Sequence, residues 1–207
     1  PDYRQRLRAV AELSYEGHQL AEATAIETIA TLQPAEERAG WSLSISLFSN
    51  LTQLKQKNVL RYWPEIKGLN APGAKVINEV LVALIDARQD GSPKVSIGDG
   101  QYCRFRDRLY LLKVSEEADS SIEQQKDLIW NIDNPFNLSD GSHLTVEQTV
   151  GDGLRADLAV ALSVTIRKGG ERCKPAGRGH SNSLKKLLQE FNVEPWWRDR
   201  APLFFID

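Results

Sequence analysis

Hydrophobic positions recur at helical spacing in three stretches of the chain. Residues 4–32 keep one apolar side, which predicts one or two helices ended by Pro34. A second helix is expected over residues 51–63, ended by Pro64. The clearest periodicity covers residues 74–88 and predicts an amphipathic helix with a buried stripe.

Elsewhere the apolar positions alternate or cluster as they do in strands. Residues 95–105 predict a hairpin around the turn Gly98-Asp99-Gly100. Between residues 34 and 49, apolar residues alternate with serines, which resembles a strand. Further strands are expected at residues 109–112, 128–130, 144–146 and 162–166, and a short helix at residues 183–191.

The order of these elements predicts an α + (α+β) protein. Residues 1–114 are expected to form a mainly helical first domain with a small hairpin. Residues 115–125 are acidic and poor in apolar side chains, so we expect a linker there. Residues 126–207 are expected to form a small α+β domain with a mixed sheet and one short helix.

Composition narrows the class of protein. The chain has 207 residues, of which 41% are hydrophobic and 26% charged, as in a protein with a sizeable core. No apolar run approaches the roughly 18 residues that a membrane span needs, so we expect no membrane partner and a cytoplasmic location. The two cysteines lie far apart, which is typical of reduced thiols. The chain begins with Pro1 and contains no Met, so we expect a segment of a longer protein.

Charge is distributed unevenly along the chain. The net charge is −2, yet residues 165–203, here called the basic segment, carry nine Lys or Arg against four acidic residues. Ser181 and Ser183 are suitable N-caps for its short helix. Cations around a helix start, where N–H groups are unpaired, favour phosphate as a ligand. The alternative is a capped surface helix whose lysines are merely solvated.

The basic segment also carries a family resemblance. It contains an Arg-x-Gly-Gly-Glu turn, a Pro-x-Gly-Arg loop, Ser-x-Ser-Leu-Lys-Lys-Leu-x-Gln-Glu and Pro-Trp-x-Arg-Asp followed by Pro-Leu. These features resemble the C-terminal domain of bacterial tRNA(Ile)-lysidine synthases. The preceding region resembles the helical substrate-binding domain of the same family more weakly.

The resemblance implies a function for the whole enzyme and a smaller role for this chain. The family uses ATP and magnesium in an N-terminal domain to adenylate the wobble cytidine of an isoleucine tRNA, which lysine then converts to lysidine. The phosphate loop of that domain, Ser-Gly-Gly-x-Asp-Ser, has no counterpart here, since Gly169-Gly170 lacks the serines and the aspartate. We therefore expect the C-terminal portion of a ligase, without catalytic, cofactor-binding or metal-binding residues of its own.

The expected partners are the acceptor side of tRNA-Ile, the enzyme's own N-terminal catalytic domain and, as an open possibility, a second copy in a homodimer. Recognition of an RNA helix should rest mainly on shape and charge. The residues expected to contact tRNA are Arg172, Lys174, Arg178, His180, Ser181, Ser183, Lys185, Lys186 and, as a weaker candidate that Asp199 or Glu194 could pair with, Arg198.

Several features have competing interpretations. Cys173 and His180 could form a nucleophile and base, but a lone cysteine beside a strand is more often packing, and no metal-ligand spacing is visible. Trp196 or Trp197 could stack on a base or pack in the core. The arginines at 104, 106 and 108 could form a second phosphate-binding patch or the solvent-exposed face of a small sheet.

The competing function for the chain is a protein-interaction or dimerisation module without tRNA contact.

Overall fold

The computed structural model describes residues 2–37, 40–85, 93–114, 128–137, 143–151, 153–155, 161–199 and 201–206. The chain divides into two compact units, Pro1–Val114 and Ser115–Asp207. The linker expected at residues 115–125 lies outside the described residues. The expected combination of α and β elements, a helical first part followed by a small sheet-containing part, is confirmed.

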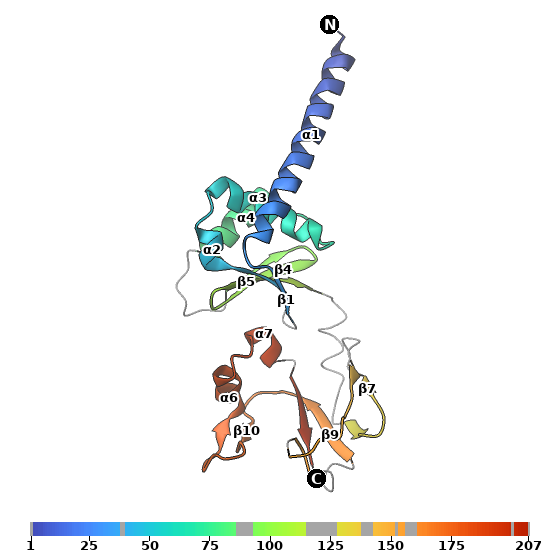
Figure 1. The fold of residues 1–207 in the computed structure, drawn as a ribbon, viewed down its shortest axis with the longest axis vertical. Helices are drawn as coiled ribbons and strands as arrows, with labels where there is room; N and C mark the ends of the chain where they lie inside the picture. The colour runs from blue at the N-terminus through green and yellow to red at the C-terminus, as the bar shows by residue number, and fades with distance from the viewer. Residues whose placement is uncertain are drawn as a thin grey trace. The chain divides into compact units, whose positions relative to one another are not determined.

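The first unit begins with one long helix, α1 (Tyr3–Ala30), where one or two were expected. Asp2 caps its start by accepting the N–H of Arg4 at 3.2 Å. Only its C-terminal part packs in the unit, alongside α3 (Gln53–Ile66), as Figure 1 shows. Its earlier apolar side chains are exposed, among them Leu7, Val10, Leu13 and Leu20.

The serine-rich stretch is half strand and half helix. After β1 (Ala35–Glu37), β2 (Gly40–Ser44) leads directly into α2 (Ile45–Ser49). The Ser44 hydroxyl accepts the N–H of Leu47 at 3.3 Å, and the Asp107 carboxylate accepts the N–H of Ser46 at 3.0 Å. These caps start a helix where alternation alone predicted a continuing strand.

The expected hairpin is present, but it belongs to a larger sheet. β3 (Lys94–Ile97), β4 (Gly100–Phe105) and β5 (Arg108–Lys113) join β1 and β2 in the antiparallel order β1-β2-β5-β4-β3. The prediction of a small hairpin in the first domain therefore underestimated its β structure, which is a five-stranded sheet. Pairing of β2 with β5 joins segments more than sixty residues apart, which periodicity does not reveal.

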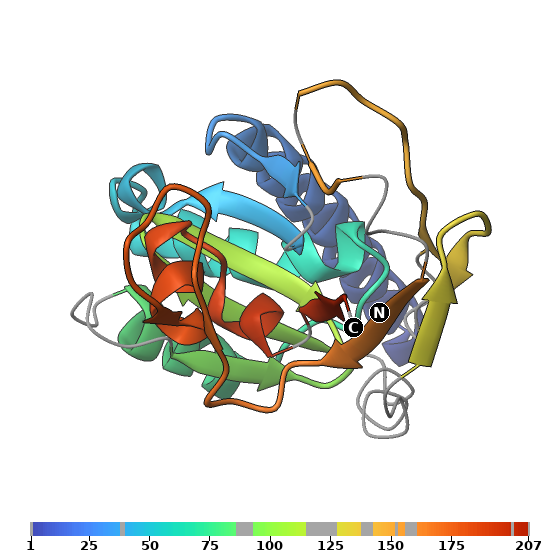
Figure 2. The same ribbon diagram turned by 90° about the horizontal axis from the view of Figure 1, so that it is seen from below.

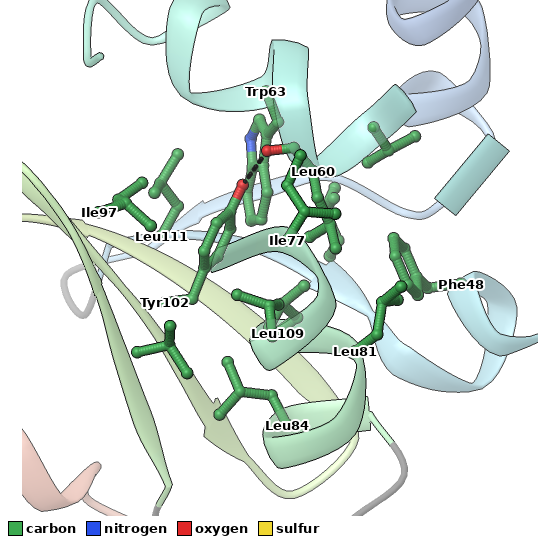
Figure 3. Packing of buried hydrophobic residues seen from close by; sticks show 14 of the residues in the cluster. Phe48, Leu60, Trp63, Ile77, Leu81, Leu84, Ile97, Tyr102, Leu109 and Leu111 are labelled. Carbon is green, nitrogen blue, oxygen red and sulfur yellow. Dashed lines mark hydrogen bonds between the residues drawn. The ribbon is translucent and has the colours of Figure 1, made fainter. Parts of the chain in front are cut away.

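Helices pack on this sheet around one hydrophobic core. These helices are α3, α4 (Ala74–Val80) and its π-helical continuation η1 (Leu81–Ile85). We expected one helix over residues 74–88, of which residues 86–88 lie outside the described residues. Figure 3 shows the side chains that fill the space between helices and strands, including Phe48, Leu60, Trp63, Ile77, Tyr102 and Leu109.

A buried tyrosine explains how α3 tolerates a proline. We expected Pro64 to end the helix, and this was wrong, because α3 continues to Ile66. Pro64 has no N–H to donate to the carbonyl of Leu60, its partner one turn earlier. The hydroxyl of Tyr102 donates to that carbonyl instead, at 2.9 Å (Figure 3). Burial raises the pKa of Tyr102 well above its ordinary value, so the hydroxyl keeps its proton.

The three alternating arginines do not share one exposed face, because the chain turns at Arg106. Arg104 is buried, and its Nη1 donates to the carbonyls of Leu84 at 2.8 Å and Ile85 at 3.1 Å. Arg108 donates from Nη2 to the hydroxyl of Ser42 at 2.7 Å. Arg104 therefore joins the sheet to η1 and Arg108 joins β5 to β2, while Arg106 remains exposed.

The second unit contains a three-stranded antiparallel sheet in the order β12-β9-β6. Its strands are β6 (Leu128–Asn131), β9 (Ala161–Ile166) and β12 (Pro202–Phe205). One face carries a small core of Trp130, Leu162 and Val164, against which the hairpin β7 (Phe136–Asn137) and β8 (His143–Leu144) packs. A mixed sheet was expected, but every strand pair in the described part of this unit is antiparallel.

The segment between β9 and α6 (Leu184–Glu190) leaves the sheet and loops beside that helix, as Figure 2 shows. It contains the two-residue strands β10 (Arg172–Cys173) and β11 (Asn182–Ser183). A second short helix, α7 (Pro195–Arg198), follows α6, where only one helix was expected. Among the described residues, no helix is long and apolar enough to cross a membrane.

Candidate nucleic-acid interface

The basic segment is organised by a turn directly after β9. Gly169 and Gly170 have φ angles of 92° and 85°, which side-chain-bearing residues rarely adopt, so the glycine pair allows the chain to reverse there. The Glu171 carboxylate closes the turn by accepting the N–H of Gly169 at 2.6 Å and that of Lys168. The chain then enters β10 with its direction fixed.

A buried arginine fixes this turn to the end of α7. The Arg167 side chain is only 9% exposed; its Nε lies 3.4 Å from Glu171, and its Nη1 lies 2.9 Å from Asp199. Burial alone would raise the pKa of Glu171, but the backbone N–H donors and Arg167 together hold it below its ordinary value. Sequence reasoning missed this cluster, although the four-residue spacing of Arg167 and Glu171 around two glycines was visible.

Two of the expected contact residues hold the β10–β11 hairpin together. Arg172 donates from Nη2 to the carbonyl of Ser181 at 3.0 Å, and the Ser181 hydroxyl donates to the carbonyl of Cys173 at 3.3 Å. These bonds fix the base of the loop that carries Lys174 and His180. Both Arg172 and Ser181 remain exposed, so their roles combine loop structure with surface charge or polarity.

Arg178 is already engaged within the protein. Its Nη1 lies 2.7 Å from the Glu190 carboxylate, and the two side chains are 39% and 36% exposed. The pair joins the loop to the last turn of α6. A phosphate bound by Arg178 would therefore compete with Glu190, which lowers the share of binding we assign to this arginine.

The start of α6 offers fewer free N–H groups than the sequence indicated. The Ser183 hydroxyl accepts the N–H of Lys186 at 3.4 Å, as an N-cap does. The N–H of Leu184 donates to the carbonyl of Glu171 at 2.8 Å. With the helix only seven residues long, any anion binding here depends on side chains.

Five basic side chains of the basic segment are exposed and have no side-chain partner among the described residues. These are Lys168, Lys174, His180, Lys185 and Lys186, which make no side-chain hydrogen bond or ion pair with any part of the chain that the structure describes. Lys185 and Lys186 lie in the first turn of α6, and Lys174 follows β10 directly. With Lys168, which follows β9 at the glycine turn, these lysines supply accessible positive charge in the described part of the segment.

In the C-terminal part of the basic segment, the side chains of one arginine and two tryptophans are half-buried in the fold. Arg198 is half-buried and donates from Nε to the carbonyl of Val193 at 2.8 Å; burial and the nearby Arg167 lower its pKa. Trp196 and Trp197 are also half-buried. Asp199 and Glu194, which we considered as partners for Arg198, both act to raise its pKa, and Asp199 also forms an ion pair with Arg167.

The two cysteines lie in different surroundings. Burial raises the pKa of the Cys103 thiol to about 12, although Lys94 opposes the shift, so this thiol stays protonated and unreactive. Cys173 is exposed on β10. Within the described ranges, no group of three His, Cys, Asp or Glu side chains could hold a metal ion.

Two family models match the chain, and each coincides with part of one structural unit. The TilS substrate binding domain matches residues 43–110, and the TilS substrate C-terminal domain matches residues 162–207. The chain belongs to the TilS family. Its TilS C-terminal domain includes β9, the basic segment and β12, so the Arg167 cluster and the exposed lysines all lie within it.

Curated relatives of this TilS-family chain carry the name tRNA(Ile)-lysidine synthase. The protein from Methylococcus capsulatus is 31% identical over 183 residues, covering 87% of this chain and 40% of the relative. The protein from Coxiella burnetii is 32% identical over 166 residues, covering 79% and 36%, and that from Serratia proteamaculans is 30% identical over 201 residues, covering 95% and 43%. The chain thus spans about 40% of the length of these relatives.

Proposed function

We propose that this chain binds tRNA through the exposed lysines of its basic segment. The observation that carries the proposal is that Lys174, Lys185 and Lys186 are exposed and unpaired among the described residues, next to arginines already held by the fold. Lys185 and Lys186 lie on α6, and Lys174 directly follows β10 in the loop whose base is held by Arg172 and Ser181. The family's name for residues 43–110, a substrate binding domain, supports a nucleic-acid role for the first unit as well.

The reaction we propose for the whole protein is that of the relatives' name. A tRNA(Ile)-lysidine synthase uses ATP and lysine to convert the wobble cytidine of tRNA-Ile with a CAU anticodon to lysidine. We assign ATP and magnesium to a catalytic domain outside this sequence, and we propose that this chain contributes no catalytic residue. Its part is to hold the acceptor side of the tRNA, in the cytoplasm, while that domain works on the anticodon.

A second candidate function is a protein contact, and the surface of α1 favours it. Leu7, Val10, Leu13 and Leu20 are each at least half exposed on that helix. Such a surface suits the catalytic domain of the same enzyme or a second copy of the chain. Because α1 belongs to the first unit, this function is compatible with tRNA binding by the second.

Binding of the 207-residue chain to a CAU-anticodon isoleucine tRNA across a salt series tests the proposal. An acceptor-arm minihelix and an isolated anticodon hairpin run in parallel. We expect binding to the tRNA and the minihelix, with an affinity that falls steeply as salt rises, because phosphate contacts release counterions. Equal binding to the anticodon hairpin and the minihelix would reject the acceptor side, and salt-insensitive binding would reject the lysines as the contact.

A further inference from the structure

The sheet of the second unit has two chemically different faces. Along β9, Leu162 and Val164 belong to the Trp130 core, so the alternate residues Ser163 and Thr165 face the other way. Strand register places Phe205 opposite Ser163 and Leu203 opposite Thr165. The second face therefore combines hydroxyl groups with an aromatic and an aliphatic side chain.

This second face is hollowed where it meets the glycine turn. A hollow of about 730 Å³ is lined by Ser163, Thr165, Leu203 and Phe205 from the strands and by Lys168 and Glu171 from the turn. Its volume lies within the range of sites that hold small organic molecules. Phe205 is 49% exposed, so much of its surface is available to a ligand.

The charges around the hollow favour an anionic ligand. Its acidic residue, Glu171, uses its carboxylate to accept the N–H groups of Lys168 and Gly169, and it faces Arg167. The Lys168 side chain is exposed and has no hydrogen-bond or ion-pair partner among the residues that the structure describes. One neutralised carboxylate and one available ammonium leave a net attraction for phosphate.

We infer that this hollow holds a single unstacked nucleotide of RNA, an inference that rests on the proposed function. The base stacks on Phe205, the Thr165 hydroxyl, which donates to the carbonyl of Ile166 at 3.4 Å, accepts a hydrogen bond from the base or sugar, and Lys168 contacts the phosphate. The glycine turn that forms one wall of the hollow leads directly into Arg172 and Lys174. RNA bound on those side chains would place its single-stranded end within reach of the sheet.

Three RNA hairpins with one common stem test the inference with the full 207-residue chain. One is blunt, one carries a four-nucleotide single-stranded 3′ extension, and one carries a 5′ extension. We expect one of the two extended hairpins, with either the 3′ or the 5′ extension, to bind about tenfold more tightly than the blunt hairpin. This gain in affinity corresponds to the stacking of one base on an aromatic ring. Phe205→Ala should remove that advantage and leave binding of the blunt hairpin unchanged, whereas Phe205→Trp should keep it.

A matched control is Phe191→Ala, which removes another exposed aromatic ring of the same unit from outside the hollow. It should keep the preference for the extended hairpin. Equal, salt-sensitive binding of all three hairpins by the unmodified chain would overturn the hollow as a nucleotide site while leaving the proposed function intact. Loss of self-association in Phe205→Ala, with no change in the hairpin preference, would assign the hollow to a second copy instead.

Discussion

The Arg167 guanidinium group lies 2.9 Å from the carboxylate of Asp199, 32 residues later in the chain. This contact joins the turn after β9 to the end of α7, and so it closes the basic segment into one structural piece. The same arginine lies against Glu171, whose carbonyl accepts the N–H of Leu184 at the start of α6. The exposed lysines are therefore positioned by side chains that need not touch RNA.

Removal of Arg167 should cost far more stability than removal of its exposed partner. Arg167→Ala leaves the Glu171 carboxylate without its cation, and we expect a loss of about 3 kcal/mol from the second unit. Asp199→Ala should cost less than about 1 kcal/mol, because Asp199 is 83% exposed. Native-state hydrogen exchange of the β9 amides measures both. Equal losses would contradict a central role for Arg167.

The stability of the second unit should fall in acid because of Glu171. The pKa of its carboxyl is lowered in the folded chain from an ordinary value of 4.5, so the unfolded chain takes up the proton first as pH falls. The stabilisation is present above pH 4.5 and is lost as pH falls through the lower folded pKa. Glu171→Gln should make the unfolding free energy of this unit flatter with pH over that window. An unchanged acid slope in the variant would reject the assignment.

Tyr102 and Pro64 should be energetically coupled through the carbonyl of Leu60. Tyr102→Phe leaves that buried carbonyl without a donor, at a cost of about 1–3 kcal/mol. In a Pro64→Ala background, the new N–H can bond to the carbonyl, so the same change should cost clearly less. A double-mutant cycle by urea denaturation measures the difference. Additive losses would show that the hydroxyl does not substitute for the missing N–H.

Much of this architecture could be predicted from the sequence. The features that were predicted wrongly have physical explanations. Apolar periodicity predicted α1 and the β3–β4 hairpin because each depends on neighbouring residues. The switch from β2 to α2 depends on Asp107, and the passage of α3 through Pro64 depends on Tyr102, both distant in sequence. Long-range partners of this kind leave no periodic signal.

In the same way, only part of the candidate site could be predicted from the sequence. Composition alone identified the basic segment, since charge is a property of the residues themselves. Which cations remain available depends on the fold: Arg178 pairs with Glu190 twelve residues away, whereas Lys185 and Lys186 project from α6 into solvent. The sequence therefore predicted the surface but could not separate its contact residues from its structural ones.

Glu190 should weaken RNA binding by occupying Arg178. Glu190→Gln removes one negative charge and releases the guanidinium group, so we expect RNA affinity to rise about twofold to fivefold at low salt, the range of a surface ion pair. Fluorescence anisotropy with the acceptor-arm minihelix measures the change. The double variant Arg178→Gln/Glu190→Gln provides the control and should lose the gain. Weaker binding by Glu190→Gln would show that the ion pair positions the loop for RNA.

The most direct test of the central claim compares the salt dependence of minihelix binding before and after two charges are removed from α6. For Lys185→Ala/Lys186→Ala we predict that the slope of log affinity against log salt becomes shallower by about two, near one per lost phosphate contact. Lys185→Arg/Lys186→Arg should retain the original slope. The alanine changes should leave the helix intact, because cations at a helix start oppose its dipole. An unchanged slope in the alanine variant, with an unchanged circular-dichroism spectrum, would contradict the claim that these lysines bind RNA.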